Sequence, residues 1–145
     1  MSVAAARPAR LAAVQALLAA NGLPGDDLTA EHLRHFWVWT DAAAIVGVVG
    51  LEPRGRAALL RSLAVREDRR GGGIGGRLAA LAESQAAALG IDTLYLLTTS
   101  AERFFAARGY AAIPRDATPP AIRETAEFAG ICPSSAVCMT KRLAG

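Results

Sequence analysis

The sequence is poor in lysine, cysteine and histidine, and each shortage excludes a class of site. Lys141 is the only lysine, so no Lys-Ser/Thr pair completes a Walker nucleotide loop anywhere near the glycine-rich stretch of this chain. The two cysteines, Cys132 and Cys138, are too few for a secreted disulfide scaffold, and no histidine lies near them to complete a zinc site. We therefore expect two unpaired thiols and no metal ion.

Long apolar runs and a strong charge imbalance are also missing. No apolar run approaches the roughly 18 residues that a membrane-spanning helix needs. The net charge of +3 is too small, and the arginines too scattered, to indicate nucleic-acid binding. The apolar stretch after Arg7 and Arg10 contains Gln15 and Asn21, which favours an amphipathic helix over a signal peptide. We expect a cytoplasmic protein that binds neither nucleic acid nor membranes, folded as a single domain over residues 1–145.

Apolar periodicity and turn signals predict alternating strands and helices. We expect strands at 3–6, 36–40, 44–52, 57–65, 93–98, 110–113 and 136–141, and helices at 8–21, 29–35, 74–89, 100–108 and 118–130. The short connections between residues 36 and 65 predict an antiparallel meander, and the strand, helix and strand that follow predict a right-handed parallel crossover. The fold class is therefore α/β (α+β), with a mixed and mainly antiparallel sheet.

The stretch 59–78, LLRSLAVREDRRGGGIGGRL, joins an apolar strand to a helix through a cluster of glycines. Glycines at such a junction allow a tight turn whose free amide N–H groups point to one place. The beginning of the helix adds partial positive charge at the same place. A loop of this kind binds an anion, most simply a phosphate.

The spacing of the glycines separates two kinds of phosphate loop. Gly71, Gly73 and Gly76 fit the G-x-G-x-x-G pattern of a dinucleotide site, but that loop opens the first βαβ unit and has an acidic residue at the end of the next strand. Here the loop lies in mid-chain and Asp92 precedes the next strand. The remaining pattern is R-G-x-G-x-G from Arg70, with a Leu-Ala-Val strand ahead of it.

This last pattern resembles the R/Q-x-x-G-x-G/A loop of the GNAT acyltransferase superfamily, which holds the pyrophosphate of acetyl-coenzyme A (acetyl-CoA). Three more segments resemble that superfamily in the same order. Leu63-Ala64-Val65 resembles its fourth strand, Tyr95–Thr99 its fifth strand, and Ala101–Phe105 with Gly109-Tyr110 the element that flanks the thiol. The resemblance implies the GNAT fold, with about seven strands, helices on both faces of the sheet and a V-shaped splay between the fourth and fifth strands. It also implies acetyl-CoA as co-substrate and a small-molecule amine as acceptor.

The resemblance assigns the coenzyme site residue by residue. Its members lie on the fourth strand, in the glycine loop and after the fifth strand: Leu63, Ala64, Val65, Arg70, Gly71, Gly72, Gly73, Ile74, Gly75, Gly76, Thr99, Phe104 and Phe105. Phe105 stands where many relatives have a tyrosine that acts as general acid, and a phenyl ring donates no proton. The loss costs little, since a thiol of pKa about 8.5 leaves as thiolate near pH 7.5 for about 1.4 kcal/mol. The alternative donors are Tyr110, Thr98, Thr99, Ser62 and Cys132.

Some segments resemble one subfamily more closely. LLRSLAV, LYLLTT-x-AE-x-FF and the tail from Pro120 to Ala136 resemble the arsenic-resistance N-acetyltransferases, and LTT…FF…GY with CP-x-SA also resembles small bacterial N-acetylglutamate synthases. The acceptor implied is an amino acid or an amino-acid-like arsenical, in detoxification or resistance. The alternatives are a biosynthetic, glutamate-type N-acetyltransferase and a non-catalytic acetyl-CoA sensor, which Phe105 suggests. A homodimer is the default assembly.

The candidate catalytic groups are few. Glu52, at the end of the third strand, is the candidate general base, and the alternative is a solvated residue beside the Pro53 turn. An α-amine of pKa about 8 is substantially neutral near pH 7.5, whereas a lysine-type amine of about 10.4 needs roughly 4 kcal/mol to lose its proton. A chain with few bases is therefore better matched to an α-amine. A backbone N–H near Leu63 is expected to stabilise the oxyanion.

Arg61 and Ser62 are polar residues inside an otherwise apolar strand, and strand alternation places them on opposite faces. A guanidinium on the cleft side could bind a substrate carboxylate through both nitrogens, whereas the alternative is an arginine whose stem packs on the sheet while its head reaches water. Thr98 and Cys132 are the other substrate candidates. Trivalent arsenic prefers thiolates, which Cys132 and Cys138 would supply, and structural thiols are the alternative.

Overall fold

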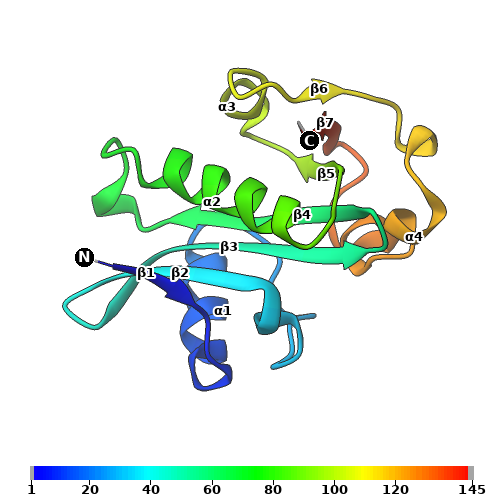
Figure 1. Ribbon diagram of the computed structural model, residues 1–145. Coiled ribbons are helices and arrows are strands. Elements are labelled where there is room, and N and C mark those ends of the chain that lie inside the picture. Colours follow the sequence, from blue (N-terminus) through cyan, green and yellow to red (C-terminus); the bar gives the residue numbers. More distant parts are fainter. Residues whose placement is uncertain (1, 144–145) are drawn as a thin grey trace. The chain divides into compact units, whose positions relative to one another are not determined.

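The strands of the computed structural model, which describes residues 2–143, form a seven-stranded sheet in the order β1-β2-β3-β4-β5-β7-β6 (Figure 1). The strands are β1 (Ser2–Ala5), β2 (Phe36–Asp41), β3 (Ala44–Arg54), β4 (Ala57–Val65), β5 (Thr93–Thr98), β6 (Ala111–Ala112) and β7 (Val137–Arg142). The helices are α1 (Leu11–Ala20), α2 (Ile74–Ala88), α3 (Glu102–Ala106) and α4 (Pro120–Arg123). Short 3-10 turns at Pro8–Arg10, His32–His35, Glu67–Arg69 and Arg115–Ala117 and a π-helical turn at Glu127–Ile131 complete the order.

The strand directions confirm the predicted fold class. β1 pairs antiparallel with β2, β2 with β3, and β7 with both β5 and β6. β4 and β5 are parallel, and their register joins Ala57–Leu59 to Thr93–Tyr95 at the beginning of both strands. The strand order and the single parallel pair recorded for the described residues match the mixed, mainly antiparallel sheet expected from the sequence.

Several predicted element boundaries differ from the structure: the helix expected at 29–35 is only the 3-10 turn His32–His35, and two other boundaries differ for identifiable local reasons. β3 extends through Pro53 to Arg54, so the turn to β4 is formed by Gly55 and Arg56 and not by Pro53. The helix predicted at 100–108 is the shorter α3, which begins after Ala101, and the Ala101 N–H donates to Thr98 Oγ1 at 2.9 Å.

The helix predicted at 118–130 is interrupted. It is present as α4 and as the π-helical turn Glu127–Ile131, in which Gly130 has a φ of 156°. Between them the Thr125 hydroxyl donates to the carbonyl of Ile122 at 2.6 Å, and such a side-chain bond competes with the helical backbone bonds.

The described chain divides into two compact units. The first consists of the residues up to Leu51 together with Arg61–Ser84, and the second of Glu52–Leu60 with the residues from Gln85 onward. β3 and β4 contribute residues to both. That residues 1–145 form a single domain stays a prediction.

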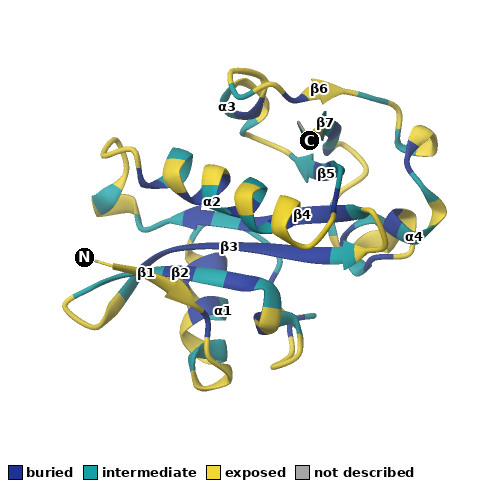
Figure 2. Cartoon of the chain, in the orientation of Figure 1, coloured by how far each residue is buried: buried dark blue, intermediate teal, exposed yellow. Residues whose placement is uncertain are grey.

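The first unit is layered around β2 and β3. Val14, Leu17 and Leu18 of α1 pack with Phe36, Val38, Val48 and other buried side chains on one face. On the opposite face, a Cβ at Gly47 would lie 2.9 Å from Leu78 Cδ1 and 3.2 Å from Ile74 Cγ2, so α2 packs closely over that glycine. Figure 1 shows the two helices on opposite sides of these strands. Residues 46–52 of β3 are all buried, whereas the edge strand β1 is exposed throughout (Figure 2).

The second unit is organised around β5 and β7. Leu94 and Leu96 of β5 are buried with Cys138 and Met139 of β7. The segment that leads to β7 is held by Arg115, whose guanidinium donates to the carbonyls of Pro133 at 2.8 Å and Ala136 at 3.2 Å. Among the described residues, no helix has both the length and the apolar character needed to span a membrane.

Candidate active site

The glycine loop between β4 and α2 has the geometry of an anion-binding turn. Gly71 and Gly73 have φ angles of 87° and 84°, a left-handed conformation that residues with a Cβ adopt only at a cost. Residues 71–73 are exposed, and α2 begins directly after them at Ile74. The first amide N–H groups of a helix have no partner within it, so an exposed loop at this place is suited to offer backbone donors and the positive end of the helix to an anion.

The arginines next to the loop differ in how their charges are balanced. Arg66 donates to both carboxylate oxygens of Asp68, at 2.6 and 3.0 Å, and Arg69 is paired with Asp41. Arg70, the residue predicted to contact the coenzyme, is exposed and donates to two neutral acceptors, Asn21 Oδ1 and the Val65 carbonyl. Its positive charge therefore stays available to an anion at the loop.

β4 contains a backbone irregularity at Ser62, whose φ is 61°. A non-glycine residue in this conformation costs about 1–3 kcal/mol and persists only where its surroundings impose it. Arg61 Nε donates to Ser62 Oγ at 3.0 Å, although neighbouring side chains of a regular strand point to opposite faces. The predicted alternation of Arg61 and Ser62 was therefore wrong, because the left-handed residue bends the strand as a bulge does. Such irregularities gather at functional sites.

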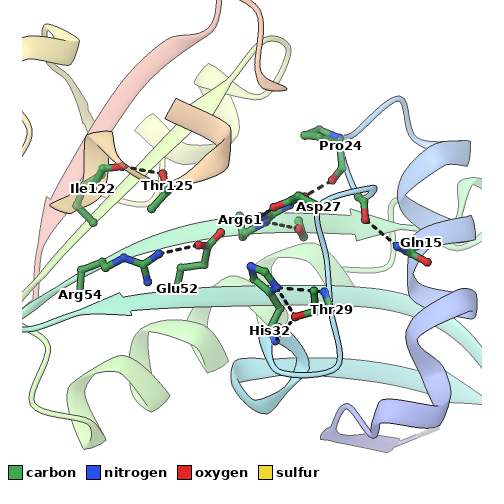
Figure 3. Close-up of polar contacts among 12 residues, drawn as sticks. Gln15, Pro24, Asp27, Thr29, His32, Glu52, Arg54, Arg61, Ile122 and Thr125 are labelled. Atoms are coloured by element: carbon green, nitrogen blue, oxygen red, sulfur yellow. Dashed lines mark hydrogen bonds and ion pairs between the residues drawn. The ribbon is translucent and has the colours of Figure 1, made fainter. Parts of the chain in front are cut away.

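The Arg61 guanidinium is bound within the protein (Figure 3). Its Nη1 donates to Asp27 Oδ2 at 2.6 Å and its Nη2 to Asp27 Oδ1 at 2.8 Å. The arginine side chain is 0% exposed and that of Asp27 15%. Burial alone would raise the pKa of the Asp27 carboxyl, but the hydrogen bonds and charge of Arg61 outweigh it and leave that pKa below its usual value. The predicted two-nitrogen contact with a carboxylate is present, with Asp27 as its partner.

Sequence reasoning did not single out Asp27. One signal was available, because an arginine inside an apolar strand needs a counter-charge when it is buried. The chain nevertheless contains 13 acidic residues, and the sequence does not say which of them reaches β4.

We predict that Asp27→Asn destabilises the protein by about 3 kcal/mol at pH 7, because it removes the carboxylate that pairs with the buried Arg61 guanidinium. The folded-state pKa of Asp27 lies below its ordinary value of 3.8, so the stabilisation is fully present above pH 3.8 and is lost as the pH falls through the lower folded pKa. Urea unfolding of both proteins at pH 7 and pH 3 measures this. A difference in the free energy of unfolding that is the same at both pH values would contradict it.

Glu52, the predicted general base, lies within β3 and is 6% exposed. Arg54 Nη2 donates to its Oε1 at 3.3 Å, a contact between two residues on the same strand (Figure 3). The alternative of a fully solvated strand-end residue does not fit this burial. The role of Glu52 as a base remains a prediction.

The candidates that follow β5 form an aromatic group in the second unit. Phe105 is buried, and its ring meets those of Phe104 and Tyr110 edge to face, with centroids 5.0 and 5.3 Å away. Tyr110 is 4% exposed, and Lys141 Nζ lies 5.6 Å from its ring centroid. Thr99 is exposed, while Thr98 holds the first turn of α3. The structure thus brings Phe104, Phe105 and Tyr110, which were predicted to flank the thiol, into one aromatic group.

Cys132 and Cys138 form no disulfide, and they differ in their surroundings. Cys132 is half-buried, whereas Cys138 is buried in β7. Burial raises the pKa of the Cys138 thiol to about 11, so it is a poor thiolate ligand near neutral pH.

We predict that iodoacetamide at pH 7.5 modifies Cys132 in the folded protein and leaves Cys138 unmodified. With a pKa of about 11, roughly one Cys138 thiol in 3,000 is ionised at that pH, and the residue is only 3% exposed. Mass spectrometry of tryptic peptides, with and without prior unfolding in urea, reports both sites. Equal modification of the two cysteines in the folded protein would be the contrary result.

The candidate residues divide between the two units. The first unit contains Arg61–Val65 and the loop from Arg70 to Gly76, which the chain holds in one continuous segment. The second contains Glu52, Thr98, Thr99, Phe104, Phe105, Tyr110 and Cys132.

Residues 32–112, more than half of the chain, match the family described as "Acetyltransferase (GNAT) domain". Solved structures share the fold. N-acetylglutamate synthase from Neisseria gonorrhoeae, complexed with coenzyme A and N-acetyl-glutamate, superposes with a TM-score of 0.85 at 23% identity, over 99% of this chain and 35% of that one. The chain thus spans about a third of the length of that synthase.

Two shorter proteins match over nearly their whole length. Rv2747 from Mycobacterium tuberculosis, solved in complex with CoA, gives a TM-score of 0.81 at 21% identity, over 99% of this chain and 100% of that one. Aminoglycoside 6'-N-acetyltransferase complexed with coenzyme A gives 0.72 at 18% identity, over 100% of this chain and 98% of that one. At these identities the likeness shows the fold alone.

Proposed function

The chain belongs to the GNAT acetyltransferase family, and we propose that it transfers acetyl from acetyl-CoA directly to the primary amine of an amino acid or an amino-acid-like small molecule. The observation that carries the proposal is the continuous segment from Arg61 to Gly76. In it a strand bent at Ser62 leads into a left-handed glycine loop and the beginning of α2. That segment offers backbone donors to the thioester at one end and to phosphates at the other.

In this proposal, different segments of the chain bind different parts of acetyl-CoA. The amides of Gly71–Gly76 and the beginning of α2 bind the pyrophosphate, and the exposed Arg70 guanidinium, which donates to the neutral Asn21 Oδ1, adds a positive charge. The backbone of Leu63, Ala64 and Val65 pairs with the pantetheine arm. Thr99, Phe104 and Phe105 line the thiol end. Coenzyme A in the neighbouring structures supports acetyl-CoA as the co-substrate, and the division among these residues follows the sequence resemblance.

The reaction then needs one nucleophilic step and one proton transfer. The neutral amine nitrogen attacks the thioester carbon, and the developing oxyanion accepts a hydrogen bond from the backbone N–H near Leu63. The tetrahedral intermediate collapses as its C–S bond breaks, and coenzyme A leaves as a thiolate. The nitrogen gives its proton to Glu52, directly or through a water. Since Phe105 donates no proton, departure as thiolate costs about 1.4 kcal/mol near pH 7.5.

The class of acceptor follows from the same energetics. An α-amine is substantially neutral near pH 7.5, so a site with a single candidate base suits it. One of the similar structures, N-acetylglutamate synthase, is named for the acetylation of an amino acid. The sequence resemblance to arsenic-resistance enzymes adds amino-acid-like arsenicals to the proposed acceptors, with Thr98 and Cys132 as candidate contacts. The cytoplasmic location and the homodimer remain predictions.

Thiol release from acetyl-CoA, followed with a thiol dye, tests the proposal against a panel of α-amino acids, arsonic and phosphinic analogues and polyamines. We expect release with one anionic α-amine and its loss in Arg70→Ala. Release with glutamate alone would favour a biosynthetic enzyme over detoxification. Tight acetyl-CoA binding with no release from any amine would overturn the proposal in favour of a sensor.

A further inference from the structure

We propose that Asp27 is a positioning residue, which acts through Arg61 to hold Ser62 in its left-handed conformation and thereby sets the direction of the Leu63 N–H. The inference rests on the proposed function, in which that N–H stabilises the oxyanion. It assigns a role to the segment after α1 that neither the family match nor the similar structures provide.

The peptide between Ser62 and Leu63 sets the direction of the Leu63 N–H. In a regular strand, successive N–H groups point alternately toward the two neighbouring strands. At a φ of 61°, Ser62 rotates the following peptide plane out of that alternation. The direction of the Leu63 N–H is thus fixed by one strained residue. If Ser62 relaxed to an ordinary strand conformation, the donor would turn away.

Ser62 is held in this conformation by Arg61. Its hydroxyl accepts a hydrogen bond from Arg61 Nε at 3.0 Å, and both residues are buried, at 7% and 2% exposure. This contact exists because the left-handed conformation brings two sequence neighbours to the same side. A return to regular alternation would break it. The buried guanidinium would then lose a hydrogen bond, so the arginine favours the bent strand.

Arg61 is held in turn by Asp27. Both outer nitrogens of the guanidinium bind the Asp27 carboxylate, and Nη2 lies 3.5 Å from the Pro24 carbonyl (Figure 3). A planar fork bound at two points has one orientation, so the direction of Nε is fixed as well.

The segment that carries Asp27 is itself anchored to α1. Gln15 Nε2 donates to the Gly25 carbonyl at 3.0 Å, and the Leu28 N–H donates to the same carbonyl at 3.1 Å. A Cβ at Gly25 would lie 3.1 Å from Leu18 Cδ1, so the backbone packs closely against the helix. The carboxylate is therefore held in place before any substrate arrives.

Stability alone is a poor reason for this pair. A buried ion pair is often no more stabilising than apolar residues of the same size, because two charges lose their water. A fixed direction for Nε is something that apolar side chains cannot supply. A direct contact between Arg61 and a substrate carboxylate would need the guanidinium to leave Asp27, since its side chain is 0% exposed.

The test compares the same replacement in two backgrounds. Arg61→Lys keeps the charge opposite Asp27 and removes the Nε donor. We expect kcat to fall about tenfold while the KM for acetyl-CoA changes less than threefold. In a Ser62→Gly background, where glycine adopts a positive φ without strain, we expect the same replacement to cost less than about threefold. Asp27→Asn should behave likewise in both backgrounds.

Two further variants serve as controls. Ser62→Ala keeps a side chain that disfavours a positive φ and removes the hydroxyl that Arg61 binds, so Arg61→Lys should add little to its loss of kcat. Asp92→Asn removes an exposed partner of Arg56, bound at 3.0 Å, and should leave kcat and KM unchanged.

A second readout does not depend on turnover. In protein labelled with ¹⁵N-leucine, the Leu63 amide signal should move in Arg61→Lys and return toward the signal of Ser62→Gly in the double variant. Dispersed signals also report that each variant folds. If the wild type acetylates no amine, the proposed function fails. The Leu63 amide signal then still decides whether Arg61, held by Asp27, acts on Ser62.

Two results would overturn the inference. Equal losses in both backgrounds, with no movement of the Leu63 signal, would mean that Arg61 does not act through Ser62. A rise in the acceptor KM at constant kcat would mean that Arg61 binds the acceptor itself.

Discussion

Replacing Gly71 and Gly73 together by alanine is expected to raise the dissociation constant for acetyl-CoA about 30-fold or more. Their φ angles of 87° and 84° cost an L-residue about 1 kcal/mol or more each, and 2 kcal/mol corresponds to about 30-fold in affinity. A Cβ at either position would meet no atom within 4 Å, so the effect comes from the backbone alone. The loop would relax, and its amides would no longer point to one place. Isothermal titration with acetyl-CoA measures the change.

A matched pair of glycines provides the control. Gly55 and Gly90 have φ angles of 68° and 82°, and a Cβ there also meets no atom within 4 Å. They lie in the β3–β4 turn and after α2, outside the proposed coenzyme site. Alanine at both should lower stability by a similar mechanism and leave the affinity unchanged. If the Gly71/Gly73 and Gly55/Gly90 double variants bound acetyl-CoA with equal affinity, the glycine loop would not be part of the coenzyme site.

Gly50→Ala is expected to destabilise the protein by about 3 kcal/mol, because its methyl would enter the ring of Phe36. The two residues are register partners on β3 and β2, and the added Cβ would lie 2.3 Å from Phe36 Cε1 and Cζ. Phe36 is 0% exposed and packs in the core beside α1, so it has little room to move. Overpacking of a filled core typically costs about 1–3 kcal/mol, and a clash with a whole ring belongs at the upper end. Urea unfolding measures the loss.

The double variant Phe36→Leu/Gly50→Ala isolates the ring as the cause. Leucine shortens the side chain at 36, so Gly50→Ala should cost less than about 1 kcal/mol in that background. A cost that is the same with phenylalanine and leucine would show that Gly50 is required for its backbone and not for the space beside it.

The features that the sequence predicted correctly are those with a local pattern. The strand at 93–98 and the junction from Leu59 to Leu78 carry period-2 runs, turn residues and glycine spacing, and the structure has β5 at Thr93–Thr98 and α2 beginning at Ile74. Family membership confirms the predicted superfamily and the acetyltransferase class. Such elements are determined by residues that are neighbours in the sequence, so a single sequence is enough to predict them.

The features that were missed depend on contacts between distant residues. Arg61 was recognised as unusual, but its partner Asp27 lies 34 positions away, and only the fold brings them together. Strand alternation predicted opposite faces for Arg61 and Ser62, whereas a buried ion pair imposes a left-handed residue in mid-strand. Local propensity does not predict a positive φ at a serine, because this conformation is unfavourable unless contacts with distant residues stabilise it.

The most direct test of the account is the transfer of a labelled acetyl group. Protein, acetyl-CoA carrying ¹³C in its acetyl group and the panel of amines are incubated together, and the amines are analysed by mass spectrometry. The account predicts one anionic α-amine that carries the labelled acetyl on its nitrogen, in an amount equal to the coenzyme A released. Coenzyme release with labelled acetate as the only product, or coenzyme binding with no labelled product, would contradict it.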